Sequence, residues 1–279
     1  PSSLEKLLIS PFDWLLNRLN IESKEWEPQE LGPALQGNIA HKVFELYKGH
    51  QHEGYSDTLF RALFEQAITA EAPFMNQAFW RIEKANLMRE IQLAFEVFAN
   101  WLANTDWIIA EAELLAEGKF ESLDTKGFID AVLKHPEQTL ILDYKKSKSN
   151  DRIKRLEKGF DVQTAIYRKL YNDKNKDTVV ITGYFNLNDR KMVTDTPMVE
   201  GNKSWIKAIN TALSAQSEQA LALIRRRLED LRQGKIAMSH PDMGKEWKKV
   251  GITAYSLENN ILVKRFMNES AEKELGGDK

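Results

Sequence analysis

The middle of the chain alternates between short apolar runs and polar intervals. Phe128–Leu133 and Thr139–Leu142 are apolar and β-prone, and the interval between them contains Pro136, which does not fit in a central strand. Two such runs joined by such an interval predict a β-hairpin. A turn centred near Pro136 and Glu137 places Asp130 of the first run opposite Asp143 of the second.

The same patterns extend over most of the chain and predict an α/β fold. Four runs of β-prone residues indicate a small mixed sheet of about four strands: Trp107–Leu115, Thr125–Leu133, Thr139–Lys145 and Val179–Leu187. Apolar residues at helical spacing predict the helices Gly37–Tyr47, Asp57–Ala70, Pro73–Asn104, Asp161–Tyr171 and Ser204–Gln233, and Asp189–Lys203 is interpreted as a loop. The helix that starts near Asp161 crosses between the last two strands, which predicts that these two are parallel.

The chain begins with apolar residues at helical spacing that Pro11 interrupts. Ser2-x-x-Glu5 has the spacing of a capping box, and Asp161 is a candidate N-cap of its own helix. We expect one large domain: a helical part over residues 1–104, an α/β core over 105–190, and a C-terminal helix and tail over 191–279. Since the first residue is Pro and not Met, we also expect a segment of a longer protein.

Composition narrows the classes of function. The chain has 279 residues, of which 42% are hydrophobic and 29% charged, as in ordinary globular proteins. It has no cysteine, which excludes disulfides, zinc thiolates and iron–sulfur clusters and favours an intracellular, cytoplasmic location. The net charge is −2, so binding to nucleic acid needs a local positive patch.

The predicted hairpin carries candidate chemistry at one end. Two opposed carboxylates repel each other unless a proton or a cation lies between them. Asp130, Asp143 and the backbone carbonyl of Tyr144 would offer hard oxygen ligands that suit Mg²⁺ or Mn²⁺. Lys145 leaves the same face of its strand as Asp143 and could orient water or stabilise negative charge. Alternatively, an aspartate at a strand end is a turn former or a solvated residue.

Four further features are ambiguous on spacing alone. His41 lies beside the apolar stripe of its helix, and Glu111 and Glu113 share one face of a strand. Gln163 and Tyr167 are four apart on a predicted helix and therefore close in space. The segment after Lys145 is basic, and we interpret it as a mobile loop that contacts phosphate. Its candidate DNA-binding residues are Lys146, Lys148, Arg152, Lys154 and Arg155.

These residues together resemble a known family. Gly127-Phe-Ile-Asp130, Leu142-Asp143-Tyr144-Lys145 and Gln163-Thr-Ala-Ile-Tyr167 resemble the three C-terminal motifs of the RecB-like branch of the PD-(D/E)XK nucleases. Gly37-Asn-Ile-Ala-His41 resembles its G-x-x-x-H helix motif, and the segment from Ser2 to Phe12 resembles its opening motif. The five matches follow the family's order, and within that branch the chain resembles the nuclease domains of AddB-type helicase–nuclease subunits.

The resemblance implies a restriction-endonuclease-like core and a DNA nuclease that needs Mg²⁺ or Mn²⁺. It implies that His41 contributes to the metal site, that a glutamate of the first strand lies near it, with Glu113 favoured and Glu111 kept open, and that Gln163 and Tyr167 face the active site. An exonuclease in DNA repair or recombination, with DNA and a helicase domain or subunit as partners, is the expected function. The alternatives are a non-catalytic DNA-binding or scaffolding module of a repair complex and an unrelated α/β protein.

The chain departs from that family at one point. Relatives with an iron–sulfur cluster have cysteine before the Pro-Phe pair, whereas this chain has Ser10. We therefore expect no cluster, and we expect Phe12 and Trp14 to pack against C-terminal residues such as Trp247 instead.

Overall fold

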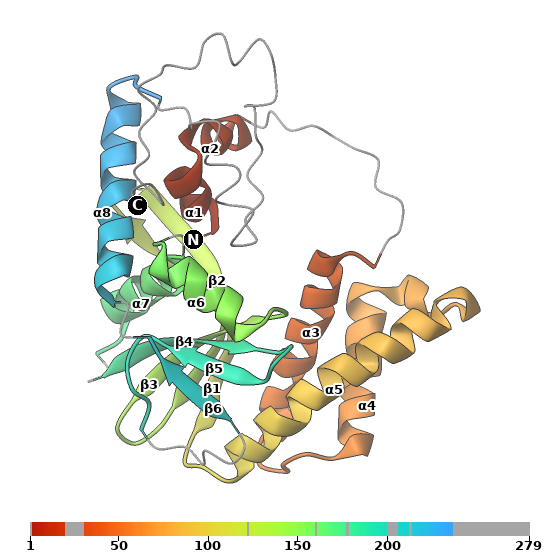
Figure 1. Ribbon diagram of the computed structural model, residues 1–279. Coiled ribbons are helices and arrows are strands. Elements are labelled where there is room, and N and C mark those ends of the chain that lie inside the picture. Colours follow the sequence, from red (N-terminus) through yellow and green to blue (C-terminus); the bar gives the residue numbers. More distant parts are fainter. Residues whose placement is uncertain are drawn as a thin grey trace.

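A computed structural model describes residues 2–19, 31–121, 123–159, 161–176, 179–199, 206–211 and 214–236. In this part of the chain one mixed sheet lies between two groups of helices (Figure 1). The sheet has six strands in the order β1-β2-β3-β4-β5-β6. Their bounds are β1 Ile108–Phe120, β2 Leu123–Lys134, β3 Thr139–Lys145, β4 Val180–Asn186, β5 Lys191–Thr194 and β6 Lys207–Asn210.

The strand directions follow from the lengths of the connections. β1, β2 and β3 are antiparallel neighbours joined by short turns, and β4 and β5 are also antiparallel. β3 and β4 are parallel because two helices, α6 (Ser149–Glu157) and α7 (Gln163–Lys174), connect them. β5 and β6 are parallel as well.

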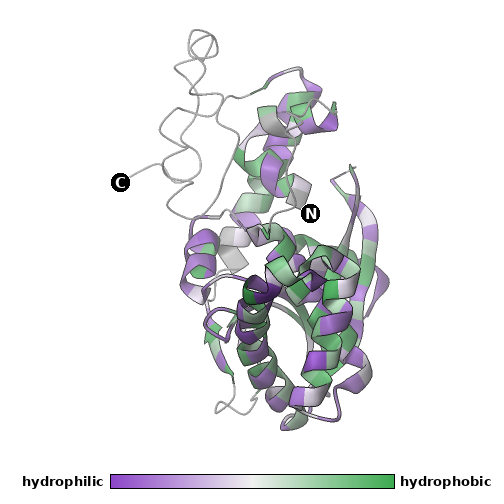
Figure 2. Cartoon of the chain, turned by 90° about the vertical axis from the view of Figure 1, so that its right-hand side faces the viewer, coloured by the Kyte–Doolittle hydropathy of each residue, from purple (hydrophilic) through white to green (hydrophobic). Residues whose placement is uncertain are grey.

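Each face of the sheet is covered by helices from a different part of the chain. α3 (Pro33–Tyr47), α4 (Asp57–Glu71) and α5 (Arg81–Ala103) share a core with one face, to which Leu140, Leu142 and Tyr144 of β3 contribute. α1 (Ser2–Ile9), α2 (Pro11–Arg18), α7 and α8 (Ser214–Arg232) share a second core, to which Ile141 contributes. The helices carry bands of hydrophobic and hydrophilic residues, as expected of helices with one buried side (Figure 2).

The predicted fold class is confirmed, and the expected number of strands is too low. All four predicted strands are present, and the hairpin has the predicted register, with Ala131 opposite Leu142 and Val132 opposite Ile141. β5 lies in the segment that we interpreted as a loop, and β6 lies where a single helix from Ser204 was predicted. Both added strands have four residues, too few for an alternating pattern to stand out from that of a loop or helix end.

Two more local predictions are wrong. The basic segment after Lys145 forms the helix α6 and is not a loop without secondary structure. The long helix predicted over Pro73–Asn104 is divided into two short 3₁₀ helices, Pro73–Asn76 and Ala78–Trp80, and α5. No helix among the described residues is long and apolar enough to cross a membrane.

The first and last thirds of the chain meet, as the expected packing requires. α1 and α8 are in contact, and Leu4 and Leu8 share a core with Ile224 and Leu228. Trp14 belongs to the same core. Trp247, which we expected as its partner, lies outside the described residues. The helical part predicted for residues 1–104 is thus distributed over both faces of the sheet, since α1 and α2 lie with α8 (Figure 1).

Candidate metal-dependent active site

The site is organised around the backbone of Tyr144, at the end of β3. The backbone pairing between β2 and β3 stops at Ala131 and Leu142, one step before Asp130 and Asp143 would meet. Beyond that point a side chain replaces the β-ladder: the backbone N–H of Tyr144 donates a hydrogen bond of 2.8 Å to Oδ2 of Asp130. Asp130 is therefore held by β3, the strand that carries Asp143.

The other side of the Tyr144 peptide holds His41. The backbone carbonyl of Tyr144 lies 2.7 Å from Nε2 of His41, and because a carbonyl only accepts, Nε2 donates. The next turn of the same helix face supports this contact, since Phe44 stacks on the Tyr144 ring at 4.6 Å between centroids. The carbonyl of Tyr144, predicted as a metal ligand, is thus a hydrogen-bond acceptor for His41.

This hydrogen bond determines which nitrogen of His41 is available to a metal. Burial lowers the pKa of the His41 imidazole, despite the nearby charge of Asp143, so the ring is neutral. With the proton on Nε2, the lone pair is on Nδ1, which lies 3.5 Å from Oδ2 of Asp130. A histidine that donates one N–H to a backbone carbonyl and presents its other nitrogen to a carboxylate has the usual arrangement of a metal ligand.

Glu113 completes a group of three ligands. One ligand atom from each of His41, Glu113 and Asp130 lies within 4.8 Å of the others. The pairing of β1 with β2 includes Ala112–Ala131 and Leu114–Ile129 but omits Glu113, whose backbone has a φ of 48°. Such a left-handed conformation at a non-glycine residue is costly and is concentrated at functional sites.

The structure distinguishes the two glutamates that the sequence left open. Glu111 lies on the surface, and its Oε2 accepts a hydrogen bond of 2.9 Å from Nζ of Lys48. Of the two, only Glu113 belongs to the group with His41 and Asp130. The left-handed backbone at Glu113 distinguishes it from Glu111, which is in the regular ladder opposite Val132. Strict alternation of side chains along the strand places both glutamates on one face and does not distinguish them.

The charges of the group favour a bound cation. Burial, followed by the charge of Asp143, raises the pKa of Asp130 well above its usual value. Burial and the charge of Glu45 raise the pKa of Glu113. Raised carboxyl pKa values mean that the site disfavours its own negative charge, which a divalent cation would offset. Two carboxylates with a neutral imidazole suit Mn²⁺ well, and Mg²⁺ through the carboxylates.

Asp143 lies beside this group but not within it. It is almost fully buried, and its Oδ2 lies 2.6 Å from Nζ of Lys145. Its Oδ1 is also buried and accepts no hydrogen bond from the described part of the chain. A buried carboxylate oxygen without a donor is costly in a structural role, and it fits a metal ligand.

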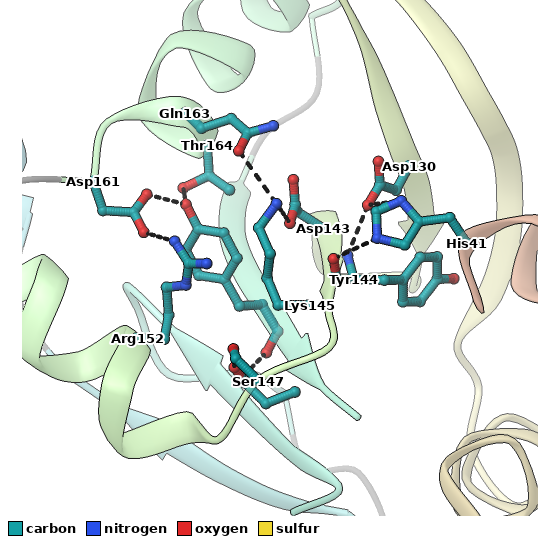
Figure 3. Close-up of polar contacts among 12 residues, drawn as sticks. His41, Asp130, Asp143, Tyr144, Lys145, Ser147, Arg152, Asp161, Gln163 and Thr164 are labelled. Carbon is teal, nitrogen blue, oxygen red and sulfur yellow. Dashed lines mark hydrogen bonds and ion pairs between the residues drawn. The ribbon is translucent and has the colours of Figure 1, made fainter. Parts of the chain in front are cut away.

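Lys145 is held as a cation between two elements. Burial acts to lower its pKa, but the charges of Asp143 and Asp130 and the contact with Asp143 together raise the pKa of Lys145. Its Nζ also donates to Oε1 of Gln163 at 3.4 Å, at the start of α7 (Figure 3). Nε2 of Gln163 in turn lies 3.5 Å from the Tyr167 hydroxyl, so these two residues are neighbours as predicted. Tyr167 itself is buried.

The basic residues of the following segment differ in their surroundings. Lys148, the N-cap residue of α6, and Lys154, within α6, are exposed, and Arg155 is partly buried. Lys146 donates to Gln36 at 2.7 Å and lies 2.9 Å from a carboxylate oxygen of Glu90. The exposed amines therefore belong to Lys148 and Lys154.

Arg152 does not have the role that the basic pattern suggested. Its guanidinium is buried, pairs with Asp161 and lies 4.5 Å above the ring of Tyr184 (Figure 3). Asp161 is also the acceptor for the hydroxyl of Tyr184, which accepts from Thr164. A cation enclosed in this way has no surface to offer to a phosphate, so the prediction of Arg152 as a DNA contact is wrong. The charge pattern along α6 does not indicate that Arg152, and not one of its basic neighbours, is buried.

Glu5, and not Asp161 as local spacing predicted, supplies the acceptor for the start of α7. Asp161 is engaged with Arg152 and Tyr184, and α7 has no capping side chain from its own N-cap residue, Val162. Glu5 accepts hydrogen bonds from the backbone N–H groups of Val162 and Gln163 instead. Sequence reasoning missed this contact because the two partners are 157 residues apart.

Comparison with known families agrees with the geometry. The family model of the PD-(D/E)XK nuclease superfamily matches residues 1–242. Since this match covers most of the chain, the chain belongs to the PD-(D/E)XK nuclease superfamily, whose members use divalent metals. No match was found among curated proteins.

Proposed function

We propose that this member of the PD-(D/E)XK nuclease superfamily hydrolyses phosphodiester bonds of DNA with Mg²⁺ or Mn²⁺. The observation that carries the proposal is the convergence of ligand atoms from His41, Glu113 and Asp130 within 4.8 Å. The Asp143–Lys145 pair lies next to this group on β3. Acids, an imidazole and an amine in this arrangement are the elements that metal-dependent hydrolysis of a phosphodiester requires.

The ligands divide into two sets in this proposal. His41, Glu113 and Asp130 hold the metal, and Asp143 adds its free Oδ1. A bound divalent metal supplies a lowered pKa for water and polarisation of the phosphoryl oxygen. The carbonyl of Tyr144 keeps His41 in the tautomer that leaves Nδ1 available for coordination.

Lys145 has a separate role. Asp143 keeps its amine protonated, and Gln163 limits where the amine can lie. A cation fixed in position stabilises the negative charge that develops on phosphate without reorganisation during the reaction. Lys145 also donates a hydrogen bond that orients the attacking water.

DNA binding follows from the exposed basic side chains. Lys148, just before α6, and Lys154, on α6, contact the phosphate backbone, with Arg155 and Lys146 closer to the protein interior. Gln163 lies at the edge of the site, and the buried Tyr167 supports it. Because all of these contacts are to phosphate and sugar, the enzyme has little sequence specificity.

The biological setting is the part of the proposal that rests on motifs. Five motifs in the order of the RecB-like branch, with an AddB-type arrangement, support an exonuclease in DNA repair or recombination. A helicase domain or subunit would then supply the DNA end, in the cytoplasm. Ser10 in place of a cysteine separates this chain from the relatives with an iron–sulfur cluster.

The proposal is tested with end-labelled linear DNA and circular DNA in Mg²⁺, Mn²⁺ or EDTA. We expect cleavage with either metal and none in EDTA, and degradation of linear DNA alone would identify an exonuclease. Glu113→Gln and Lys145→Ala should be inactive, whereas Glu111→Gln, on the same strand but paired with Lys48, should cleave at the wild-type rate.

Two results would overturn the proposal. The first is cleavage in EDTA at the rate seen with metal. The second is a folded wild-type protein that cleaves neither DNA and is not stabilised by Mn²⁺, which would indicate a non-catalytic DNA-binding or scaffolding module.

A further inference from the structure

The N-terminus of α7 lacks the local capping that helices usually have. Its first turn begins at Gln163, and the preceding N-cap residue, Val162, has an apolar side chain. The first N–H groups of a helix need acceptors from outside the helix. The nearest acid in sequence, Asp161, is occupied by Arg152 and Tyr184.

Glu5 supplies the missing acceptor from the other end of the chain. Its Oε1 accepts from the backbone N–H of Val162 at 3.1 Å and of Gln163 at 3.0 Å. α1 holds Glu5 in place, because Leu4 and Leu8 on either side of it belong to the core shared with α7 and α8.

The residue whose N–H is capped is also the residue that contacts Lys145. Oε1 of Gln163 accepts from Nζ of Lys145 at 3.4 Å, and Nε2 of Gln163 faces the hydroxyl of Tyr167. The Tyr167 contact determines which end of the amide faces the amine. Figure 3 shows Gln163 pointing toward Lys145, with Asp143 as the second neighbour of the amine.

From this chain of contacts we infer that Glu5 is a positioning residue for Lys145 and acts through the first turn of α7. The inference rests on the proposed function, because it assigns a role in the same reaction. With Glu5 present, the backbone of Gln163 is fixed and its amide holds the amine of Lys145 against Asp143. Without Glu5, the first turn frays and the amine loses one of its two neighbours.

The test compares two replacements of Glu5 that differ in one property. Glu5→Met keeps the length of the side chain and its helix propensity but removes the acceptor, whereas Glu5→Gln keeps an oxygen at the same position. We expect kcat for DNA cleavage in Mg²⁺ to fall about tenfold in Glu5→Met and less than about threefold in Glu5→Gln. KM should change less than about twofold in both variants, because Glu5 contacts no substrate.

A double-mutant cycle separates positioning from general destabilisation. If Glu5 acts through Gln163, Glu5→Met should lower kcat by less than about twofold in a Gln163→Ala background. If Glu5→Met does not fold, Glu5→Asp keeps the charge, shortens the reach by one methylene, and enters the same cycle.

Three outcomes overturn the inference: equal kcat in Glu5→Met and wild type, equal losses in Glu5→Met and Glu5→Gln, or effects that multiply in the Gln163→Ala background. A failure of the proposed function is distinguishable from these, because it appears as wild-type protein without metal-dependent cleavage. The wild-type assay is therefore done first.

Discussion

Two buried aspartates, Asp143 and Asp161, have similar burial and opposite surroundings. Both side chains are almost inaccessible to solvent, with 1% and 2% of the residue surface exposed. Asp161 has a partner for each oxygen, Arg152 for one and Tyr184 for the other. Asp143 has Lys145 for one oxygen, and the other accepts no hydrogen bond from the described residues.

The difference indicates which acid serves structure and which serves chemistry. A satisfied buried ion pair contributes to a unique packing, and removing one partner leaves an uncompensated charge. An unsatisfied buried oxygen weakens the folded state and persists where a ligand or a reaction requires it. The two acids are in adjoining regions of the molecule, so the same substitution at each gives a direct comparison (Figure 3).

The largest effect is expected from Asp143→Asn on catalysis. We predict that the cleavage rate falls about 10³-fold, because the metal loses an anionic ligand and Lys145 loses the charge that positions it. The free energy of unfolding should change by less than about 1 kcal/mol, since relief of repulsion with Asp130 offsets the lost attraction to Lys145. Single-turnover cleavage and urea denaturation measure the two quantities. Cleavage by Asp143→Asn at the wild-type rate would show that Asp143 is not part of the active site.

Asp161→Asn should show the opposite behaviour. We predict a loss of about 3 kcal/mol in the free energy of unfolding, because Arg152 stays buried without its counter-charge. Cleavage per folded molecule should change less than about tenfold. Urea denaturation measures the loss of stability.

The control for Asp161→Asn is the double variant Arg152→Met with Asp161→Asn. It should lose less stability than the sum of the two single variants, because the buried charge is removed together with its partner. Additive losses would show that the pair is not a coupled unit.

A smaller effect, the stabilisation of the protein by bound metal, distinguishes the region of Asp143 from the region of Asp161. We predict that Mn²⁺ at about 100 times its Kd stabilises the wild type by about 2.7 kcal/mol. His41→Ala should weaken Mn²⁺ binding about tenfold or more, because it removes the neutral imidazole. Thermal unfolding at several Mn²⁺ concentrations gives the affinity.

Two variants serve as controls for the metal measurement. Asp161→Asn and His50→Ala should bind Mn²⁺ with wild-type affinity, since neither residue belongs to the ligand group and His50 pairs with Glu53 on the surface. Equal affinity in His41→Ala and the wild type would be inconsistent with the ligand group described above.

The smallest effect is the pH dependence of protein stability that arises from Glu5, a neighbour of Asp161. Burial and the charge of Asp161 raise the pKa of Glu5 from 4.5 to about 7, against the opposing charges of Arg152 and Lys145. The folded state therefore favours protonated Glu5, and its contribution to stability is complete below pH 4.5 and declines as pH rises to about 7.

The difference in unfolding free energy between the wild type and Glu5→Gln isolates this contribution. We predict that the wild type loses about 1–2 kcal/mol relative to Glu5→Gln over that pH range, after allowance for partial exposure of Glu5. Urea denaturation at several pH values measures it. A difference that is constant with pH, or that grows in favour of the wild type, contradicts the prediction.

Much of the fold and part of the site could be predicted because their signals are local. The apolar alternation and Pro136 indicated the hairpin, and the turn set a register that the structure confirms. Asp130, Asp143 and Lys145 therefore come from adjacent antiparallel strands, β2 and β3, as predicted. The crossover helix after Asp161 indicated that β3 and β4 are parallel, and they are.

The sequence by itself thus determined the arrangement of β1 to β4 and the residue types at the end of β3, because a period of two along a strand and a short turn leave few registers. Tertiary structure decided which side chains from distant parts of the chain meet. The left-handed backbone at Glu113 selected it over Glu111, and packing turned Arg152 inward and brought Glu5 to α7. These outcomes depend on contacts between residues far apart in the chain, and a local pattern of hydrophobic and charged positions does not contain them.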